Sequence, residues 1–202
     1  MEKKKKITNK LKIENDGSKI AVLGLQGSGK TYFVKKLLKI YKYPVVFQVN
    51  KDDNYKKLKN CLVYEADSHL EFKQFFKFIY NIIKNNKGTK KIDAIVLDEA
   101  DLYVPTNFEV IASPEFSDMV ANHRHYGVSL ILISRRPQDI SAKVIESCKH
   151  IIIFSLQGSN AKKKLNDISD GMGNMQSKLK YQDYGFIYKR IGEEPKIYPK
   201  IK

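Results

Sequence analysis

Five hydrophobic runs recur along the chain, and apolar residues fill most positions within each. They cover residues 19–23, 45–49, 92–97, 128–134 and 151–154. Strands that are apolar at consecutive positions are typical of a parallel sheet covered on both faces, because neither side of such a strand meets water. Segments with helical spacing separate the runs. The pattern therefore predicts an α/β fold with a mostly parallel sheet flanked by helices.

The helical segments are recognised by their spacing. Residues 32–41 follow the first apolar run and are expected to form a helix. Residues 70–83 carry aromatic and aliphatic side chains at helical intervals, which predicts a helix packed on the sheet. We also expect helices at 114–126 and 139–148, and a short strand at 62–64.

The two ends of the chain differ from its middle. The first twelve residues are rich in lysine and lack the apolar segment of a signal peptide. We expect residues 1–14 to form a basic flexible arm and residues 15–202 to form a single domain. Near the other end, segments 184–189 and 196–201 flank a Gly-Glu-Glu-Pro turn, which predicts a C-terminal β-hairpin.

A glycine-rich motif follows the first apolar run. Residues 24–31, Gly-Leu-Gln-Gly-Ser-Gly-Lys-Thr, fit the phosphate-loop pattern G-x-x-x-x-G-K-[ST] between a strand and a helix. In such a loop Lys30 reaches the β- and γ-phosphates, and the Thr31 hydroxyl holds Mg²⁺. The motif predicts binding of ATP and Mg²⁺. The predicted nucleotide-binding residues are Gly24, Leu25, Gln26, Gly27, Ser28, Gly29, Lys30, Thr31 and Tyr32.

An acidic pair ends the third apolar run. Asp98 and Glu99 follow Leu97, at the carboxyl end of a predicted strand beside the phosphate loop. There Asp98 can hold a water of the Mg²⁺ shell, and Glu99 can act as the general base that polarises the attacking water. The pair favours a nucleotide hydrolase over a small-molecule kinase.

Charge changes this picture only in part. The chain has 37 Lys and Arg against 22 Asp and Glu, a formal charge of +15. Such an excess favours a polyanionic partner, but it also fits the lysine-rich composition that an AT-rich genome produces. The arginines are more informative, because there are only four, and Arg124, Arg135 and Arg136 fall within thirteen residues. Planar guanidinium groups bind phosphate in a bidentate manner.

Cysteine and histidine patterns indicate neither a disulfide framework nor a zinc site. Cys61 and Cys148 stand far apart, and His123 and His125 have no nearby Cys or third His. A reducing, cytoplasmic compartment is therefore expected. No apolar run approaches the length of a membrane span.

Two further segments carry a resemblance to a known family. Residues 122–129, Asn-His-Arg-His-Tyr-Gly-Val-Ser, and residues 132–140, Leu-Ile-Ser-Arg-Arg-Pro-Gln-Asp-Ile, resemble the HerA/FtsK superfamily of ring-forming DNA-pumping ATPases, which have a RecA/FtsK-like P-loop fold. Residues 156–160 and 184–187 resemble its closing strands. The resemblance implies that Arg124 is a catalytic finger supplied to a neighbouring subunit. Arg135 stands where the family usually has a sensor glutamine, and we expect it to contact the γ-phosphate.

A motor core of this size resembles the genome-packaging ATPases of tailless double-stranded DNA viruses with internal membranes, including the archaeal turreted icosahedral type. The resemblance implies ATP hydrolysis coupled to translocation of duplex DNA into a capsid. It also implies a homo-oligomeric ring, expected to be a hexamer, in the host cytoplasm, with capsid or internal-membrane proteins as further partners. Lysines at 51–59 and 162–164 are candidate DNA contacts or ordinary solvated surface.

Other functions remain open at this stage. The first alternative is a plasmid or cellular HerA-type DNA translocase or helicase. A P-loop kinase or nucleotide switch without a DNA role is the second, although no arginine-rich lid is evident in the sequence. A non-catalytic, ATP-gated scaffold is the third. Stimulation of ATP hydrolysis by duplex DNA would separate the motors from the others.

Overall fold

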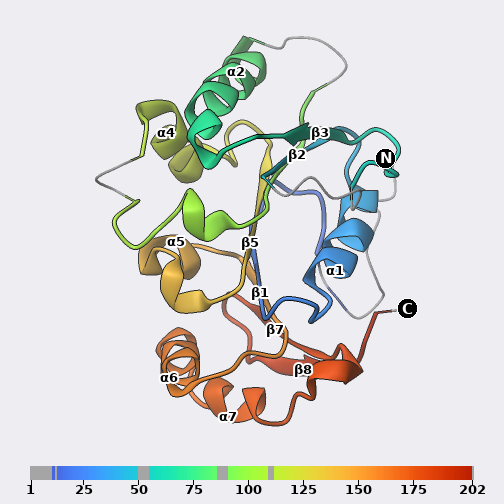
Figure 1. Ribbon diagram of the computed structural model, residues 1–202, viewed down its shortest axis with the longest axis vertical. Helices are drawn as coiled ribbons and strands as arrows, with labels where there is room; N and C mark the ends of the chain where they lie inside the picture. The colour runs from blue at the N-terminus through green and yellow to red at the C-terminus, as the bar shows by residue number, and fades with distance from the viewer. Residues whose placement is uncertain (1–10, 12, 50–54, 86–90, 109–111, 202) are drawn as a thin grey trace.

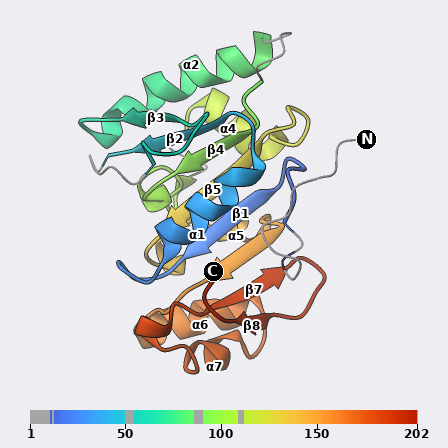
Figure 2. The same ribbon diagram turned by 90° about the vertical axis from the view of Figure 1, so that its right-hand side faces the viewer.

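A single eight-stranded sheet forms the centre of the molecule. The computed structural model describes residues 11, 13–49, 55–85, 91–108 and 112–201. The strands lie in the order β3-β2-β4-β5-β1-β6-β7-β8, and Figure 2 shows this succession from β3 to β8. The first six strands of the chain run parallel to one another, β7 pairs antiparallel with β6, and β8 pairs antiparallel with β7. The strands are β1 Lys19–Leu23, β2 Pro44–Gln48, β3 Leu62–Glu65, β4 Ala94–Leu97, β5 Ser129–Ser134, β6 His150–Ile153, β7 Phe186–Arg190 and β8 Lys196–Tyr198.

Helices cover both faces of this sheet (Figure 1). Helix α1 lies on one face, and α2, α4 and α5 lie on the other. Short 3₁₀ helices connect several of the elements. The helices are α1 Lys30–Leu37, α2 Phe72–Asn85, α4 Pro114–Asn122, α5 Ala142–Glu146, α6 Ser159–Ile168 and α7 Met172–Gln176. Among the described residues, no helix combines the length and the apolar character needed to cross a bilayer.

Successive side chains of each central strand pack alternately into two hydrophobic cores, one on each face of the sheet. In β1, Ala21 and Leu23 pack in the core beneath α2, α4 and α5, whereas Ile20 and Val22 pack in the core beneath α1. Successive side chains of a strand point to opposite faces, so a sheet covered on both sides needs apolar residues at every position. This arrangement confirms the predicted α/β fold with a mostly parallel sheet and a C-terminal hairpin.

The N-terminal prediction needs a correction at its inner end. Residues 1–10 and 12 lie outside the described residues, but Leu11 is 2% exposed and Ile13 is fully buried in the core beneath α1. The predicted flexible arm therefore does not extend to residue 14, because these two side chains leave water on folding.

Several predicted boundaries are also wrong. The helix expected at 32–41 becomes 3₁₀ after Leu37, and the helix expected at 114–126 ends at Asn122. The chain then turns at Gly127, which has φ +67°, so that β5 can begin. Within residues 156–160, which resemble a closing strand in sequence, 156–158 form a loop and 159–160 begin α6. Helices α6 and α7 fill a region for which no element was predicted.

Histidine 150 makes the stability of this fold depend on pH. Its side chain is fully buried on β6, and burial, reinforced by nearby Lys149, lowers its pKa to about 4. An unfolded histidine has a pKa of about 6.5, so the unfolded chain binds more protons between pH 6.5 and 4. The contribution of His150 to the free energy of unfolding should therefore fall by up to about 3 kcal/mol as the pH drops through this window, whereas Asp98, whose pKa burial raises to about 6, shifts the total in the opposite direction.

Chemical denaturation at pH 7.5, 6 and 4.5 measures this loss. The His150→Phe variant removes the titrating group and keeps a ring opposite Tyr188, whose ring stacks on His150 at 5.9 Å between centroids. Relative to the variant, the unsubstituted protein should lose up to about 3 kcal/mol of stability over the same window. Equal slopes for the variant and the unsubstituted protein would contradict the assignment to His150.

Candidate active site

The phosphate loop connects β1 to α1 and depends on its glycines. Gly24, Gly27 and Gly29 have φ values of +154°, +72° and +106°, which side chains rarely tolerate. A Cβ on Gly24 would lie 2.7 Å from the Cβ of Phe154. The loop can adopt this shape only because these positions carry no side chain.

The loop holds hydrogen-bonding groups that suit an anion. Among the described residues, the backbone amides of Gly27 and Gly29 have no acceptor, and the buried Ser28 hydroxyl has no partner. Lys30 Nζ donates to the carbonyl oxygens of Gly24 at 2.6 Å and Leu25 at 2.9 Å. Donors converging on one concavity are the chemistry that binds phosphate, so the residues present fit a nucleotide.

Burial also tunes the charge of Lys30. Loss of hydration lowers its pKa to about 8, and the carboxylate of Asp98 opposes this shift. A bound polyphosphate would add negative charge beside the ammonium and favour its protonated form. Lys30 is therefore poised to be cationic whenever an anion occupies the loop.

Asp98 lies at the carboxyl end of β4, facing the phosphate loop across β5. Burial raises its pKa to about 6, while the hydroxyl of Tyr55, at 3.3 Å from Oδ2, and Lys30 favour the ionised form. The strand order β4-β5-β1 brings this carboxylate and the phosphate loop close together at the carboxyl ends of the central strands. Tyr55 was not anticipated, because nothing in its local sequence marks a partner 43 residues away.

Glu99 and Arg135 form an ion pair at the same edge. Arg135 Nη2 lies 2.5 Å from Glu99 Oε1. The Arg135 side chain is 55% exposed and that of Glu99 is 22% exposed. Glu99 adopts the left-handed backbone conformation, with φ +61°, which aims its carboxylate toward the end of β5. A second contact fixes the same region, since Ser134 Oγ donates to Asp101 Oδ1 at 2.8 Å.

Two tyrosines from the C-terminal segment border the loop. Tyr181 Oη donates to the Gln26 carbonyl oxygen at 2.6 Å, and Tyr184 lies against Gly29. Sequence reasoning missed both residues, which lie at least 150 positions after the motif. The only local indication was a Tyr-Gly pair at 184–185, where Tyr184 takes a positive φ of +51°.

Arg124 lies at the amino ends of the parallel strands, opposite the carboxyl ends where the phosphate loop lies. It is exposed in the turn before β5, where its Cα lies 3.5 Å from the position that a Cβ on Gly17 would occupy. The phosphate loop follows the carboxyl end of β1. The length of a strand therefore separates Arg124 from this loop. A strand of six residues, such as β5, spans roughly 20 Å. Arg124 therefore cannot reach the phosphate loop of its own chain.

Comparisons with known proteins agree with this site. The model of the AAA family, the ATPases associated with various cellular activities, matches residues 20–156. This range contains the phosphate loop, Asp98, Glu99 and both arginines discussed above. The chain matches no curated protein sequence.

Two solved structures match over nearly the full length of both chains. B204, the DNA-packaging ATPase of Sulfolobus turreted icosahedral virus, has a TM-score of 0.74 and 20% identity, covering 91% of this chain and 98% of its own. The B204 packaging NTPase of Sulfolobus turreted icosahedral virus 2, bound to ATPγS, has a TM-score of 0.76 and 20% identity, covering 94% and 100%.

A third structure comes from a larger protein. TcpA, the conjugation coupling protein of pCW3, was solved with ATPγS and has a TM-score of 0.60 and 15% identity. The match covers 92% of this chain but 61% of TcpA. At these identities the structural matches establish the shared fold. Because the family model spans more than half of the sequence, this chain belongs to the AAA family and is a P-loop ATPase.

Proposed function

We propose that this chain is an ATP-driven motor that translocates double-stranded DNA, and that its role is to package a viral genome into a capsid. The observation that carries the proposal is the match to two viral packaging ATPases over 98% and 100% of their chains. The excess of basic residues supports a polyanionic substrate. A host-cytoplasmic location and capsid or internal-membrane partners follow from the same role.

In this proposal the phosphate loop binds the triphosphate and the acidic pair drives its hydrolysis. Lys30 exchanges the two carbonyl oxygens for the β- and γ-phosphates, and residues 24–32 surround the nucleotide. Thr31 and Asp98 are the residues that would hold Mg²⁺, which would supply positive charge to the phosphates during hydrolysis. Glu99 accepts a proton from the attacking water.

Arg135 has two anionic partners in this mechanism. Without a γ-phosphate it pairs with Glu99, so the carboxylate is occupied and poorly placed to activate water. A γ-phosphate is a stronger partner for a guanidinium because it offers more charge and several acceptor oxygens. Exchange of Arg135 from Glu99 to the phosphate would break this ion pair only when a triphosphate is bound.

Arg124 supports a ring. A finger that cannot reach its own phosphate loop can act only on the nucleotide of a neighbouring subunit. The required interface is head-to-tail, and such interfaces close into rings when the rotation between subunits permits. We propose a homo-oligomeric ring, with a hexamer as the expected form. In this ring each Arg124 neutralises transition-state charge at the active site of the neighbouring subunit.

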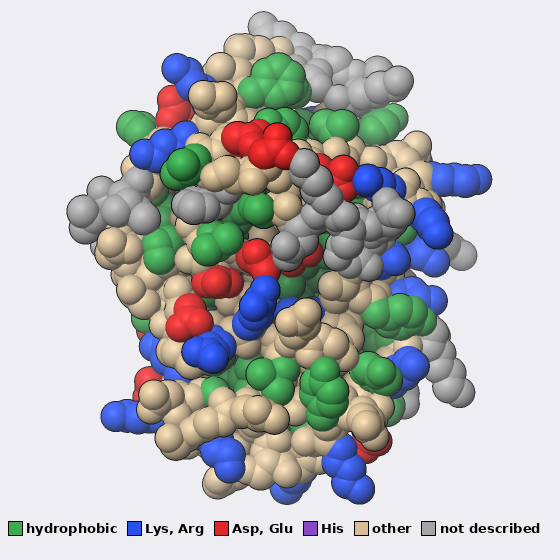
Figure 3. All heavy atoms as spheres, viewed as in Figure 1, with side chains coloured by type: hydrophobic (Ala, Val, Ile, Leu, Met, Phe, Trp, Pro, Cys, Tyr) green, Lys and Arg blue, Asp and Glu red, His purple; other side chains and the backbone are tan. Residues whose placement is uncertain are grey.

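The lysines proposed to contact DNA differ in availability. On α6, Lys162 and Lys163 are exposed, whereas Lys164 lies 4.0 Å from Asp167. Lys56 pairs with Glu65 at 3.0 Å, and residues 51–54 lie outside the described residues. On the face shown in Figure 3, Lys and Arg side chains are scattered around the periphery, and a few lie beside acidic side chains near the middle. Lys57, Lys59, Lys162 and Lys163 are therefore the exposed candidates, and the adjacent pair on α6 is the one tested first.

Duplex DNA should stimulate the ATPase in a salt-dependent manner. Each phosphate contact releases a counterion, so the logarithm of the DNA affinity falls linearly with the logarithm of the salt concentration. The Lys162→Ala/Lys163→Ala double variant should weaken DNA binding and reduce this slope by about 2. The DNA concentration giving half-maximal stimulation, measured at several salt concentrations, tests both points.

The control is the Lys35→Ala/Lys36→Ala variant, which removes the same charge from the surface of α1. An ATPase that is indifferent to DNA at low salt would overturn the translocation proposal. An unchanged slope in the α6 variant would overturn only the assignment of the DNA contacts.

The match to TcpA favours a second candidate, a translocase that moves plasmid DNA. The two candidates share the motor and differ in what receives the DNA. Co-purification with a capsid protein encoded beside this chain would support packaging. Co-purification with components of a conjugation channel would support the alternative.

A further inference from the structure

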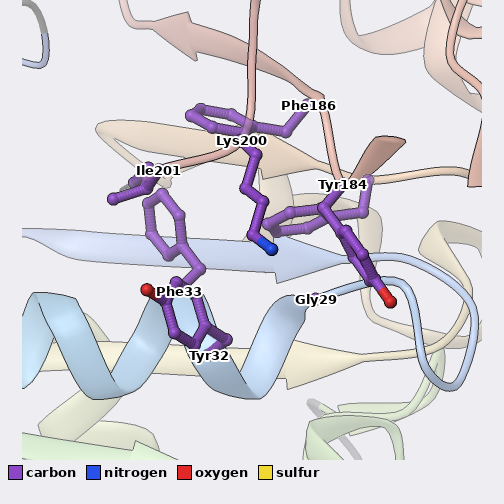
Figure 4. A pocket seen from close by; sticks show the side chains of 8 residues that line it. Gly29, Tyr32, Phe33, Tyr184, Phe186, Lys200 and Ile201 are labelled. Carbon is purple, nitrogen blue, oxygen red and sulfur yellow. The ribbon is translucent and has the colours of Figure 1, made fainter. Parts of the chain in front are cut away.

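An apolar cavity opens beside the phosphate loop, between α1 and the C-terminal hairpin (Figure 4). Its volume is about 260 Å³, just below the ~300 Å³ at the lower end of small-molecule sites. This size suits one flat ring system rather than a larger ligand. The lining residues include Gly29, Tyr32, Phe33, Tyr184, Phe186 and Lys200.

Aromatic rings form most of the cavity. Phe33 and Phe186 are buried and pack edge-to-face, with ring centroids 5.4 Å apart. Tyr32 and Tyr184 are 44% and 39% exposed at the mouth. Exposed aromatic rings around an apolar hollow commonly mark a place where a ligand covers them. The hollow therefore has the character of a stacking site.

The cavity is continuous with the phosphate loop. Gly29 belongs to both, and a Cβ placed on it would lie 3.3 Å from Tyr184 Cδ1. Tyr32 follows directly after Thr31 in the first turn of α1. A nucleotide whose phosphates occupy the loop can therefore reach the cavity with its base.

Among the described lining residues, Lys200 is the one with a charged side chain. Lys200 hangs into the cavity, with its ammonium group directed between Tyr184 and the rings of α1 (Figure 4). Its Nζ lies 4.8 Å from the centroid of Tyr184. None of the described lining residues carries a side-chain amide or carboxyl group. The side chains thus offer stacking surface, the hydroxyl groups of Tyr32 and Tyr184 at the mouth, and one mobile ammonium donor, with no buried set of donors and acceptors matched to one base.

We propose that this cavity binds the nucleobase and accepts either purine, so that the protein hydrolyses GTP as well as ATP. The inference rests on the proposed function in one respect, that the phosphate loop holds the triphosphate of the substrate. Tyr184 supplies the stacking surface, and Lys200 is the residue that biases the choice of base.

The expected discrimination follows from these groups. Sites that bond a substrate through buried polar groups reject analogues by about 10⁴-fold or more, whereas apolar pockets discriminate by only about 10–200-fold. Stacking tolerates any base but favours the larger rings of purines. A lysine donor suits the adjacent O6 and N7 acceptors of guanine better than the N6 donor and N7 acceptor of adenine. Lys200 should therefore keep GTP competitive with ATP.

Binding can be measured without hydrolysis. In the full-length Glu99→Gln protein, ATP, GTP, CTP and UTP compete against a fluorescent ATP analogue. We expect GTP to bind within about tenfold of ATP, and the pyrimidine nucleotides at least about tenfold more weakly. Values of kcat/KM for the unsubstituted protein should follow the same order.

Three further variants assign the residues. Lys200→Met should lower the affinity for GTP relative to ATP by about threefold to tenfold. Tyr184→Ala should weaken both purines by about tenfold or more, and Tyr184→Phe, which keeps the ring, should recover most of that loss. Lys196→Met is the matched control, because Lys196 is exposed on β8 and does not line the cavity.

Discrimination against GTP by more than about a hundredfold would overturn the inference. A loss in Lys200→Met that is equal for all four nucleotides would place Lys200 at the phosphates and overturn its role at the base. These outcomes are distinct from a failure of the motor proposal. If the protein binds both purines but DNA does not stimulate its ATPase, the inference about the base site stands and the proposal of a DNA-translocating motor fails.

Discussion

Replacing Glu99 by Gln is expected to lower the rate of ATP hydrolysis by about a thousandfold and to leave nucleotide binding nearly unchanged. Gln keeps the size of the side chain but cannot accept a proton from water. The phosphate loop and Lys30 do not depend on it for their contacts with phosphate. Phosphate release measures kcat, and titration with a fluorescent ATP analogue measures the dissociation constant. Turnover at the unsubstituted rate would remove Glu99 from the role of base.

Glu99→Gln also removes the ion pair between Glu99 and Arg135, so a loss of stability has to be distinguished from the loss of the base. Because Arg135 is more than half exposed, the pair is expected to stabilise the fold by at most about 1 kcal/mol. Thermal unfolding of Glu99→Gln should therefore resemble that of the unsubstituted protein. Glu194→Gln provides the matched control, since Glu194 is exposed in the turn of the C-terminal hairpin and should retain full activity.

The second large effect is expected for Arg124→Ala, which should lower kcat by about a thousandfold if the finger acts as proposed. This variant keeps its own Glu99, whereas Glu99→Gln keeps its own Arg124. Mixing the two inactive proteins should therefore restore hydrolysis at interfaces that combine one intact group from each. In a randomly mixed ring at equal amounts, about a quarter of the interfaces are complete.

Titration of one variant into the other at constant total protein measures this recovery. The steady-state rate should rise to a maximum near equal amounts. His125→Ala is the control, because His125 is the exposed neighbour of Arg124 in the same turn and should keep full activity. Absence of recovery at every ratio, in mixtures shown to form mixed oligomers, would contradict a finger that acts between subunits.

The parts of the fold that the sequence predicted are those with a local pattern. The central strands are apolar throughout, and the phosphate loop combines its motif with the strand and helix on either side. Helix α6 escaped prediction because only Ala161 and Leu165 are buried along its ten residues, too few to produce a periodic pattern. Leu11 and Ile13 escaped because they alternate with polar residues within a lysine-rich segment.

In the candidate site, too, some residues could be predicted from a local pattern and others could not. Asp98 and Glu99 could be placed beside the phosphate loop because parallel strands bring their carboxyl ends to one edge. The partners of these residues could not be placed. Tyr55 reaches Asp98 from the connection between β2 and β3, and Tyr181 reaches Gln26 from the far end of the chain. Such contacts depend on how loops cross the sheet edge, which no local sequence pattern encodes.

The left-handed backbone of Glu99 has a consequence for how this protein would evolve. A side chain other than Gly or Asn held at φ +61° costs about 1–2 kcal/mol. Substitution to Gly or Asn would relieve that strain and abolish the proposed base. Selection for hydrolysis would thus be the force that retains a glutamate there. In a lineage freed from that selection, position 99 is expected to drift early, because losing the activity would make the fold more stable.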